Sequence, residues 1–181
     1  MKSLVAFCAA ALSLLSGCAS VKMQETALVQ APKQNMAIVN FVRTRIFFGD
    51  GLPVDIWDGQ TYVGSLGAGN IIQYEATPGK HLFLGNSENW SYATADLQAG
   101  KQYFIKANLF PGVLYGRVAL AEAKPDDARI KDWLTNTPVA VSEADRKAVG
   151  DKKREKVQAA VADFEAGKVT SFAKVEQADG R

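Results

Sequence analysis

The feature that most constrains the fold of this chain is a succession of short β-type segments between residues 36 and 122. Runs rich in Val, Ile, Phe and Tyr alternate there with glycine-containing turns, a pattern typical of strands joined by short connections. We expect eight strands, near residues 36–47, 52–57, 60–66, 71–76, 81–86, 91–97, 101–108 and 113–121. Short strands with turns about every ten residues predict an antiparallel β-sandwich or barrel.

Two of the turns carry residues that indicate their geometry. Asp58-Gly59 stands between two strand-like runs, and a two-residue hairpin loop needs positive φ at both positions, which Asp and Gly tolerate. Thr77-Pro78-Gly79-Lys80 is typical of a type II turn, because proline fixes its own φ and glycine takes the positive φ that follows. We therefore expect a positive φ at Gly79.

Beyond residue 122 the pattern changes from strands to helices. Asp126 and Asp127 can cap a short helix that ends near Leu134, and Thr137-Pro138 then breaks the pattern. The segment after this breaker predicts a second, longer helix.

The longer helix has signals at both ends and one apolar face. Ser142 and Asp145 resemble a capping box with Asp in place of Glu, and Gly167 is a suitable C-terminal cap. Gly150 costs about 1 kcal/mol relative to Ala inside a helix, so a break could occur there. Four apolar residues have the spacing of a single helical face: Val157, Ala160, Val161 and Phe164.

The start of the chain has the three parts of a secretory signal peptide. Lys2 supplies a positive charge, and an apolar stretch runs from Leu4 to Leu15. A helix that crosses a bilayer needs roughly 20 apolar residues, so this stretch is too short for a permanent span. Two small residues then precede Cys18. We predict a signal peptide at residues 1–17, cleaved between Gly17 and Cys18.

The end of this segment, Leu15-Ser16-Gly17-Cys18, resembles the lipid-attachment motif of bacterial lipoproteins. The resemblance implies that Cys18 begins the mature chain and carries lipid on its sulfur and its amino group. Two or more acyl chains hold a protein firmly at a membrane. Ala19 implies the periplasmic face of the outer membrane in a Gram-negative cell, since retention in the inner membrane commonly needs Asp there. The alternative is an ordinary signal with a chance cysteine.

The remaining length and charge suit one domain with tails. We predict a lipidated tether at 18–35, a β-sandwich domain at 36–122, and a helical, partly flexible tail at 123–181. As a flexible chain the tether spans about 20 Å. The tail is expected to fray from about Lys174. Removal of Cys8 with the signal leaves no pair of cysteines for a disulfide within the chain. The formal net charge of +2 gives no reason to expect a nucleic-acid partner.

Four motifs in a fixed order add a resemblance for the β-rich part. They are Val54-Asp55-Ile56-Trp57, Tyr62-Val63-Gly64, Thr77-Pro78-Gly79-Lys80-His81 and Ala99-Gly100-Lys101-Gln102-Tyr103-Phe104-Ile105. Residues 36–121 resemble bacterial lipoprotein domains of unknown function related to PEGA-like β-sandwiches. The resemblance implies a small prealbumin-like sandwich, and it implies no activity.

No motif for catalysis, metal binding or a cofactor stands out. His81 is the only histidine, and Asp55, Asp58 and Glu75 lack the spacing of metal ligands around it. The chain has no Gly-x-Ser-x-Gly elbow, and the glycine-rich segment 64–70 lacks the Lys-Ser/Thr of a phosphate loop. We therefore predict no metal and no cofactor. A glycan-cleaving enzyme remains an alternative if two of these carboxylates converge across a groove.

Several aromatic residues are candidates for contact with a glycan, because sugar rings stack on aromatic faces. Trp57, Trp90 and Tyr92 are the candidate ligand-facing residues, with Trp133 as a further member. Trp57 alternates with apolar neighbours on its strand and so points away from the side that they share. The alternative is that these aromatics fill the core.

The densest charge in the chain is at residues 146–156, which hold six basic and two acidic residues. Arg154 and Lys156 flank the apolar helical face, and Lys153 lies beside them. Such a helix could lie on a membrane, dock onto a partner protein, or pack on the sandwich with its charges in solvent. We favour packing on the sandwich.

These observations together predict a non-enzymatic binding or scaffolding module that is anchored in the cell envelope by an N-terminal lipid. Its expected partners are the membrane and an envelope protein or glycan.

Overall fold

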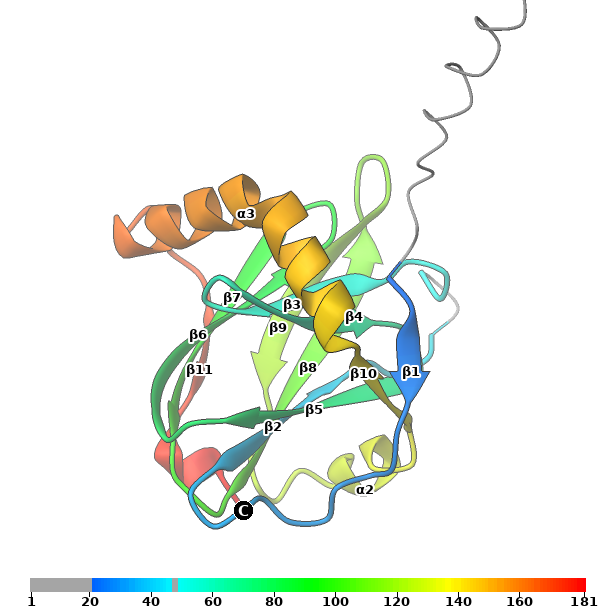
Figure 1. Cartoon of the computed structure of the whole chain (residues 1–181), viewed down its shortest axis with the longest axis vertical. Coiled ribbons are helices and arrows are strands. Elements are labelled where there is room, and N and C mark those ends of the chain that lie inside the picture. The colour runs from blue at the N-terminus through cyan, green and yellow to red at the C-terminus, as the bar shows by residue number, and fades with distance from the viewer. Residues whose placement is uncertain (1–20, 47–48) are drawn as a thin grey trace, which may run out of the picture.

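A computed structural model describes residues 21–46 and 49–181. The predicted signal peptide, its cleavage site and Cys18 lie outside these residues. Within the described ranges the chain is mainly β, with two sheets and one long helix near the C-terminus (Figure 1). None of the described helices is long and apolar enough to cross a membrane.

The two sheets are made of strands that are distant in the sequence. The larger sheet has six strands in the spatial order β1 (Met23–Glu25), β10 (Thr137–Val141), β5 (Asn70–Ala76), β2 (Ala37–Val42), β8 (Gln102–Pro111) and β9 (Gly116–Glu122). The smaller sheet has five strands in the order β11 (Ala173–Val175), β7 (Trp90–Leu97), β6 (Gly79–Asn86), β3 (Val54–Asp58) and β4 (Thr61–Leu66).

All eight predicted strands are present, with their ends shifted by a few residues, but the prediction of antiparallel pairing throughout is wrong. Strand β2 pairs in parallel with β8, β10 with β5, and β11 with β7. Hairpin signals report only on strands that follow each other in the chain. Each parallel pair joins strands from distant parts of the sequence, so no local signal specifies it.

The positive φ predicted at Gly79 is confirmed, and the predicted Asp58-Gly59 loop is displaced by one residue. Gly79 has a φ of 114°. Gly59 has a φ of 52°, but no described residue other than glycine has a positive φ. Asp58 instead ends β3 and pairs with Thr61, so the loop is Gly59-Gln60. Positive φ at the first loop position alone is the pattern of a type II′ turn.

The main hydrophobic core lies between the two sheets. Alternate residues of each strand point inward, so that Phe41 of β2 meets Phe83 of β6 edge to face at a centroid distance of 5.2 Å. Val39 and Ile105 of the larger sheet share this core with Ile56 of the smaller sheet. The sheets therefore pack face to face.

Helix α3 (Glu143–Glu165) covers the outer face of the smaller sheet, as Figure 1 shows. The Ser142 hydroxyl accepts a hydrogen bond from the Asp145 N–H at 3.1 Å, which confirms the predicted N-cap. Gly167, with a φ of 69°, follows the helix end, and the helix is continuous through Gly150. A second hydrophobic cluster lies between helix and sheet and includes Trp57, Tyr62, Leu84, Tyr92, Val149, Val157 and Ala160.

A third, smaller cluster covers the outer face of the larger sheet. Ile130 and Trp133 of the short helix α2 (Ile130–Trp133) pack there with Phe104 and Ile71. The helix begins after Arg129, whose backbone N–H donates to the Asp127 carboxylate at 2.9 Å. The predicted short helix is present, but its N-cap is Arg129 and not Asp126 or Asp127. Thr137-Pro138, predicted as a break, begins strand β10.

The described part of the predicted tether is bound to the domain. Strand β1 pairs with β10 from Met23↔Val141 to Glu25↔Val139. Farther along, the Val29 N–H donates to the Gln73 side chain at 2.6 Å. The prediction of a flexible tether over the whole of 18–35 is thus wrong, because the unpredicted strand β10 provides an edge for this segment.

The C-terminal residues are also bound rather than frayed. Strand β11 pairs with β7 from Ala173↔Ala93 to Val175↔Ala95. At the end of the chain, Gln102 and Arg181 exchange two backbone hydrogen bonds of 3.0 and 3.1 Å. The expected fraying from Lys174 is wrong, because the tail completes one sheet and caps the start of β8.

Candidate binding site

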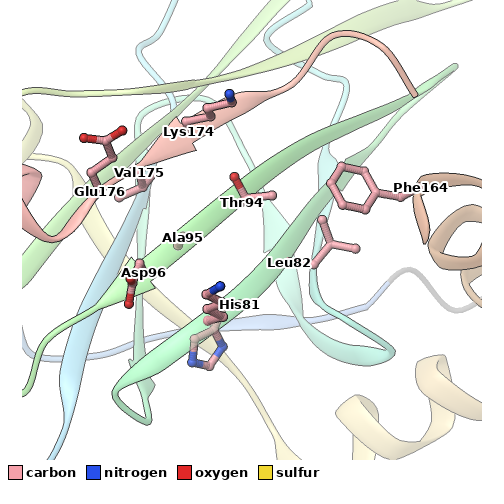
Figure 2. Close-up of a pocket in the computed structure, with 10 residues that line it drawn as sticks. His81, Leu82, Thr94, Ala95, Asp96, Phe164, Lys174, Val175 and Glu176 are labelled. Carbon is pink, nitrogen blue, oxygen red and sulfur yellow. The ribbon is translucent and has the colours of Figure 1, made fainter. Parts of the chain in front are cut away.

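A groove opens on the outer face of the smaller sheet where the end of α3 leaves it. Its volume is about 510 Å³, and strands β6, β7 and β11 form its floor (Figure 2). The side chains drawn in Figure 2 come from these strands, from Glu176 directly after β11, and from the last turn of α3. We call this cavity the α3 groove. It is lined by Lys80, His81, Leu82, Thr94, Ala95, Asp96, Phe164, Lys174, Val175 and Glu176.

Strand alternation decides which side chains reach the α3 groove. Phe83 and Val175 belong to the core between the sheets. Their neighbours Leu82 and Lys174 therefore point to the opposite, outer face, because successive side chains of a strand alternate. Figure 2 shows Leu82 directed toward Phe164 at the groove edge. The α3 groove is thus built from residues that the core does not use.

The groove combines an apolar wall with charges of both signs. Phe164 is held by two rings: it stacks on Tyr92 at 5.6 Å and meets Phe172 edge to face at 5.1 Å. Lys174 lies 5.6 Å from the centre of the Phe172 ring, an arrangement that favours a cation. Asp96 accepts a hydrogen bond from Gln177 at 3.1 Å. The apolar wall is therefore fixed in place, with charged groups around it.

His81 lines the groove only from its edge, because its imidazole is bound inside the fold. The ring stacks on Phe83 at 5.5 Å. Its Nδ1 lies 2.8 Å from Asp58 Oδ2, and its Nε2 lies 2.8 Å from the Thr77 carbonyl oxygen. Tyr74 donates to the same Asp58 oxygen at 3.1 Å. Asp58 therefore connects β3 with β6 and with β5 of the other sheet.

The protonated form of His81 is favoured by these contacts. The hydrogen bond to Asp58 raises the pKa of His81 above its usual value, and partial burial opposes this shift. Burial and the nearby Asp58 raise the pKa of Tyr74 to about 12. Both nitrogens of His81 face oxygen acceptors, so neither offers a free lone pair to a substrate or metal. Among residues 21–46 and 49–181, no cluster of His, Cys, Asp and Glu could hold a metal ion.

The three carboxylates that could have formed a glycan-cleaving pair do not converge. Asp58 is bound between the sheets, as described above. Asp55 forms an ion pair with Lys153 and accepts a hydrogen bond from Tyr62 at 3.2 Å. Glu75 pairs with Lys33 at 2.6 Å on the larger sheet. Each carboxylate has a separate partner, and no two of them face one groove.

The aromatic candidates lie mostly under α3. Trp57 has no exposed surface, and its indole N–H has no hydrogen-bond partner among the described atoms. Tyr92 is buried too and donates to the Ala160 carbonyl at 3.3 Å. Trp90 is partly exposed at the margin of the same cluster, and Trp133 is buried at α2. Trp57 and Tyr92 do point away from the main core, as alternation predicts, but the helix covers them, so the expected platform is not available to a glycan.

The basic residues of α3 are divided between ion pairs and solvent. Lys153 pairs with Asp55 across to β3, and Arg154 pairs with Asp151 on the helix itself. Lys156 is exposed. The apolar face beside them is packed on the sheet through Val157 and Ala160. Of the three arrangements left open for this helix, packing on the sandwich is the one observed.

Most residues of the α3 groove were not predicted as site residues from the sequence. Lys80, Thr94 and Asp96 occur in strands that were recognised, so their outward direction could be read from the alternation. The contribution of Lys174 and Glu176 had no local signal, because it depends on the pairing of β11 with β7.

In comparisons with known proteins, no family model, no curated protein and no solved structure matches this chain.

Proposed function

We propose that this protein is a non-enzymatic binding module of the cell envelope, anchored by a lipid on Cys18, and that it holds a polypeptide segment in the α3 groove. The observation that carries the ligand assignment is the apolar wall of Leu82 and Phe164 flanked by charges of both signs. A polypeptide presents apolar and charged side chains at the spacing of alternate residues, and it suits such a groove.

Three arrangements in the described residues favour binding over catalysis. Both ring nitrogens of His81 form hydrogen bonds, and Asp55 and Glu75 form ion pairs with lysines. General acid–base work needs a group within reach of the substrate and with a lone pair or proton to exchange. The PEGA-like relationship of residues 36–121 is part of the same proposal, and the two facing sheets support it at the level of architecture.

The anchor is tested directly through its acceptor cysteine. We expect radiolabelled palmitate to enter the wild-type chain and not the Cys18→Ser variant, because a hydroxyl does not replace the thiolate as the lipid acceptor. Equal labelling of the two chains would remove the lipoprotein assignment.

The groove is tested by crosslinking in cells. A photoreactive benzoylphenylalanine at Thr94 places the probe in the groove, and the same probe at Lys131, an exposed residue of α2 beneath the other sheet, serves as the control. We expect a discrete protein adduct from position 94 only. The adduct should be lost when Lys174→Glu reverses one charge of the groove. It should remain when Lys131→Glu reverses a charge outside the groove.

Two outcomes would contradict the proposal. Equal adducts from both positions would show that the groove has no specific occupant. Retention on purified peptidoglycan sacculi that is lost with Lys174→Glu would identify a glycan-containing ligand in place of a polypeptide.

A further inference from the structure

The most exposed apolar residues of the described chain lie together at one hairpin tip. Strands β8 and β9 are joined by residues 112–115, and Val113, Leu114 and Tyr115 are 90%, 78% and 67% exposed. Phe110 at the base of the same hairpin is 41% exposed. We call residues 110–115 the β8–β9 tip. Contiguous apolar exposure of this kind marks a surface that meets a partner or a membrane.

A single carboxylate accepts hydrogen bonds from three backbone N–H groups of the β8–β9 tip. The N–H groups of Val113, Leu114 and Tyr115 donate to the Glu88 side chain at 2.9, 3.2 and 2.9 Å. The Gly112 N–H donates to the Tyr115 carbonyl at 3.1 Å. These backbone hydrogen bonds also hold the pKa of Glu88 below its usual value.

This arrangement matters for the kind of surface the tip can meet. Backbone N–H groups that lack partners are costly in a lipid phase, because the hydrocarbon offers no acceptor. In the β8–β9 tip the protein itself supplies acceptors for four successive N–H groups. The tip therefore presents apolar side chains without free backbone donors.

The β8–β9 tip lies at the same end of the molecule as Val21 and the basic part of α3. One cavity brings Tyr115 and Glu88 together with Pro53 and Lys153. A second cavity brings Pro53 and Lys153 together with Lys152 and Val21. Figure 1 shows the hairpin loop, α3 and the beginning of the described chain on one side of the sheets.

This part of α3 has a small net positive charge, because it carries two exposed lysines without ion pairs in the described chain and one exposed glutamate, Glu155. Lys152 and Lys156 are exposed, and neither forms an ion pair within residues 21–46 and 49–181. A spacing of four residues places both on one face of α3. Lys152 lines one cavity with Lys153, and Lys153 pairs with Asp55 in the cavity that Tyr115 also lines. A basic surface beside an apolar tip is complementary to anionic headgroups above a hydrocarbon layer.

Val21 lies only three residues along the chain from the proposed lipid anchor at Cys18. Three Cα-to-Cα steps reach at most ~11 Å. Val21 packs against the hydrophobic cluster beneath α3, and β1 follows at once. A lipid on Cys18 therefore holds the Val21 end close to the headgroups, whereas a flexible tether of the predicted length would not.

We propose that the β8–β9 tip inserts into the surface of the membrane that carries the lipid anchor, with Lys152 and Lys156 against anionic headgroups. This inference rests on the proposed lipid anchor. It orients the domain: the tip and the basic part of α3 face the bilayer, and the sheet ends opposite them face away from it.

The test uses the mature lipidated protein in vesicles of phosphatidylethanolamine and phosphatidylglycerol. Cys8 leaves with the signal and Cys18 is acylated, so a bimane label enters only at an introduced cysteine. Leu114→Cys places the label at the tip, and Lys131→Cys on α2 is the matched exposed control. Val113→Cys repeats the measurement at a second tip position, in case one substitution disturbs folding.

We expect brominated lipids to quench the label at 114 and 113 severalfold more than at 131. Lys152→Glu combined with Lys156→Glu should reduce this quenching, and Lys131→Glu should leave it unchanged. Equal quenching at the tip and at the control, in protein that mass spectrometry shows to be acylated, would overturn the inference and leave the anchor intact. Unacylated protein that stays off the vesicles would overturn both, and the mass distinguishes the two failures.

Discussion

Substitution of Phe164 by Ala examines whether α3 is held on the sheet as the structure shows. Phe164 is partly buried and touches Tyr92 and Phe172 through its ring. Complete removal of a buried Phe side chain costs about 3–5 kcal/mol, and partial burial reduces this to about 2 kcal/mol. A domain of this length changes its melting temperature by about 2–4 °C per kcal/mol, so we expect a fall of about 4–8 °C.

The assay is thermal unfolding followed by circular dichroism, with urea unfolding as a second measurement of the free energy. Tyr115→Ala is the control, because it removes an aromatic ring from a position that is 67% exposed and should change the free energy of unfolding by less than about 0.5 kcal/mol. Equal melting temperatures for the two variants would refute the packing of α3. The apolar face of the helix would then be free for a membrane or a partner.

Three further predictions follow from individual contacts. The hydrogen bond to Asp58 raises the pKa of His81 in the folded state. The stabilisation that protonated His81 contributes is therefore fully present below the unfolded pKa of about 6.5 and is lost as pH rises through the folded pKa. The difference in unfolding free energy between wild type and His81→Gln should shrink on the alkaline side of that range. Gly79→Val should lower the free energy of unfolding by about 1–3 kcal/mol through backbone strain alone, since a Cβ there meets nothing within 4 Å. Gly150→Ala in α3 should instead raise the free energy of unfolding by about 0.5–1 kcal/mol. Denaturation curves in which both variants shift in the same direction would contradict this reasoning. Removal of residues 176–181 should destabilise the domain by about 1–3 kcal/mol, because Asp179 is buried against Lys124 and the last residue pairs with β8; a truncated chain with an unchanged urea midpoint would show instead that the C-terminus frays.

The local elements were predictable because their signals are local. Glycine-containing turns and alternating apolar residues located eight strands, and Ser142 with Gly167 located the ends of α3. The displaced loop at Gly59 shows how far such signals reach, since either of two adjacent residue pairs can close that hairpin. Strands β1, β10 and β11 were missed because each is short and is stabilised by a partner strand far away in the sequence.

For the candidate sites, too, local signals gave the direction of side chains, and contacts between distant segments decided their surroundings. Alternation correctly placed Trp57 on the outer side of its strand, but only the position of α3 decides that this side is buried. The exposed residues at 113–115 are visible in the sequence as part of an apolar strand, and nothing nearby indicates that Glu88, from another hairpin, satisfies their N–H groups.

The sequence by itself determined approximately where the chain turns, which residues alternate, and where the long helix begins and ends. These properties depend on φ preferences and side-chain spacing within a few residues. The tertiary structure alone decided the parallel pairings, the burial of the aromatic face under α3, the α3 groove, and the gathering of the β8–β9 tip, Lys152 and Val21 at one end. The physical reason is that these features arise from contacts between distant segments, whose free energy is gained only when the whole chain has collapsed around its core.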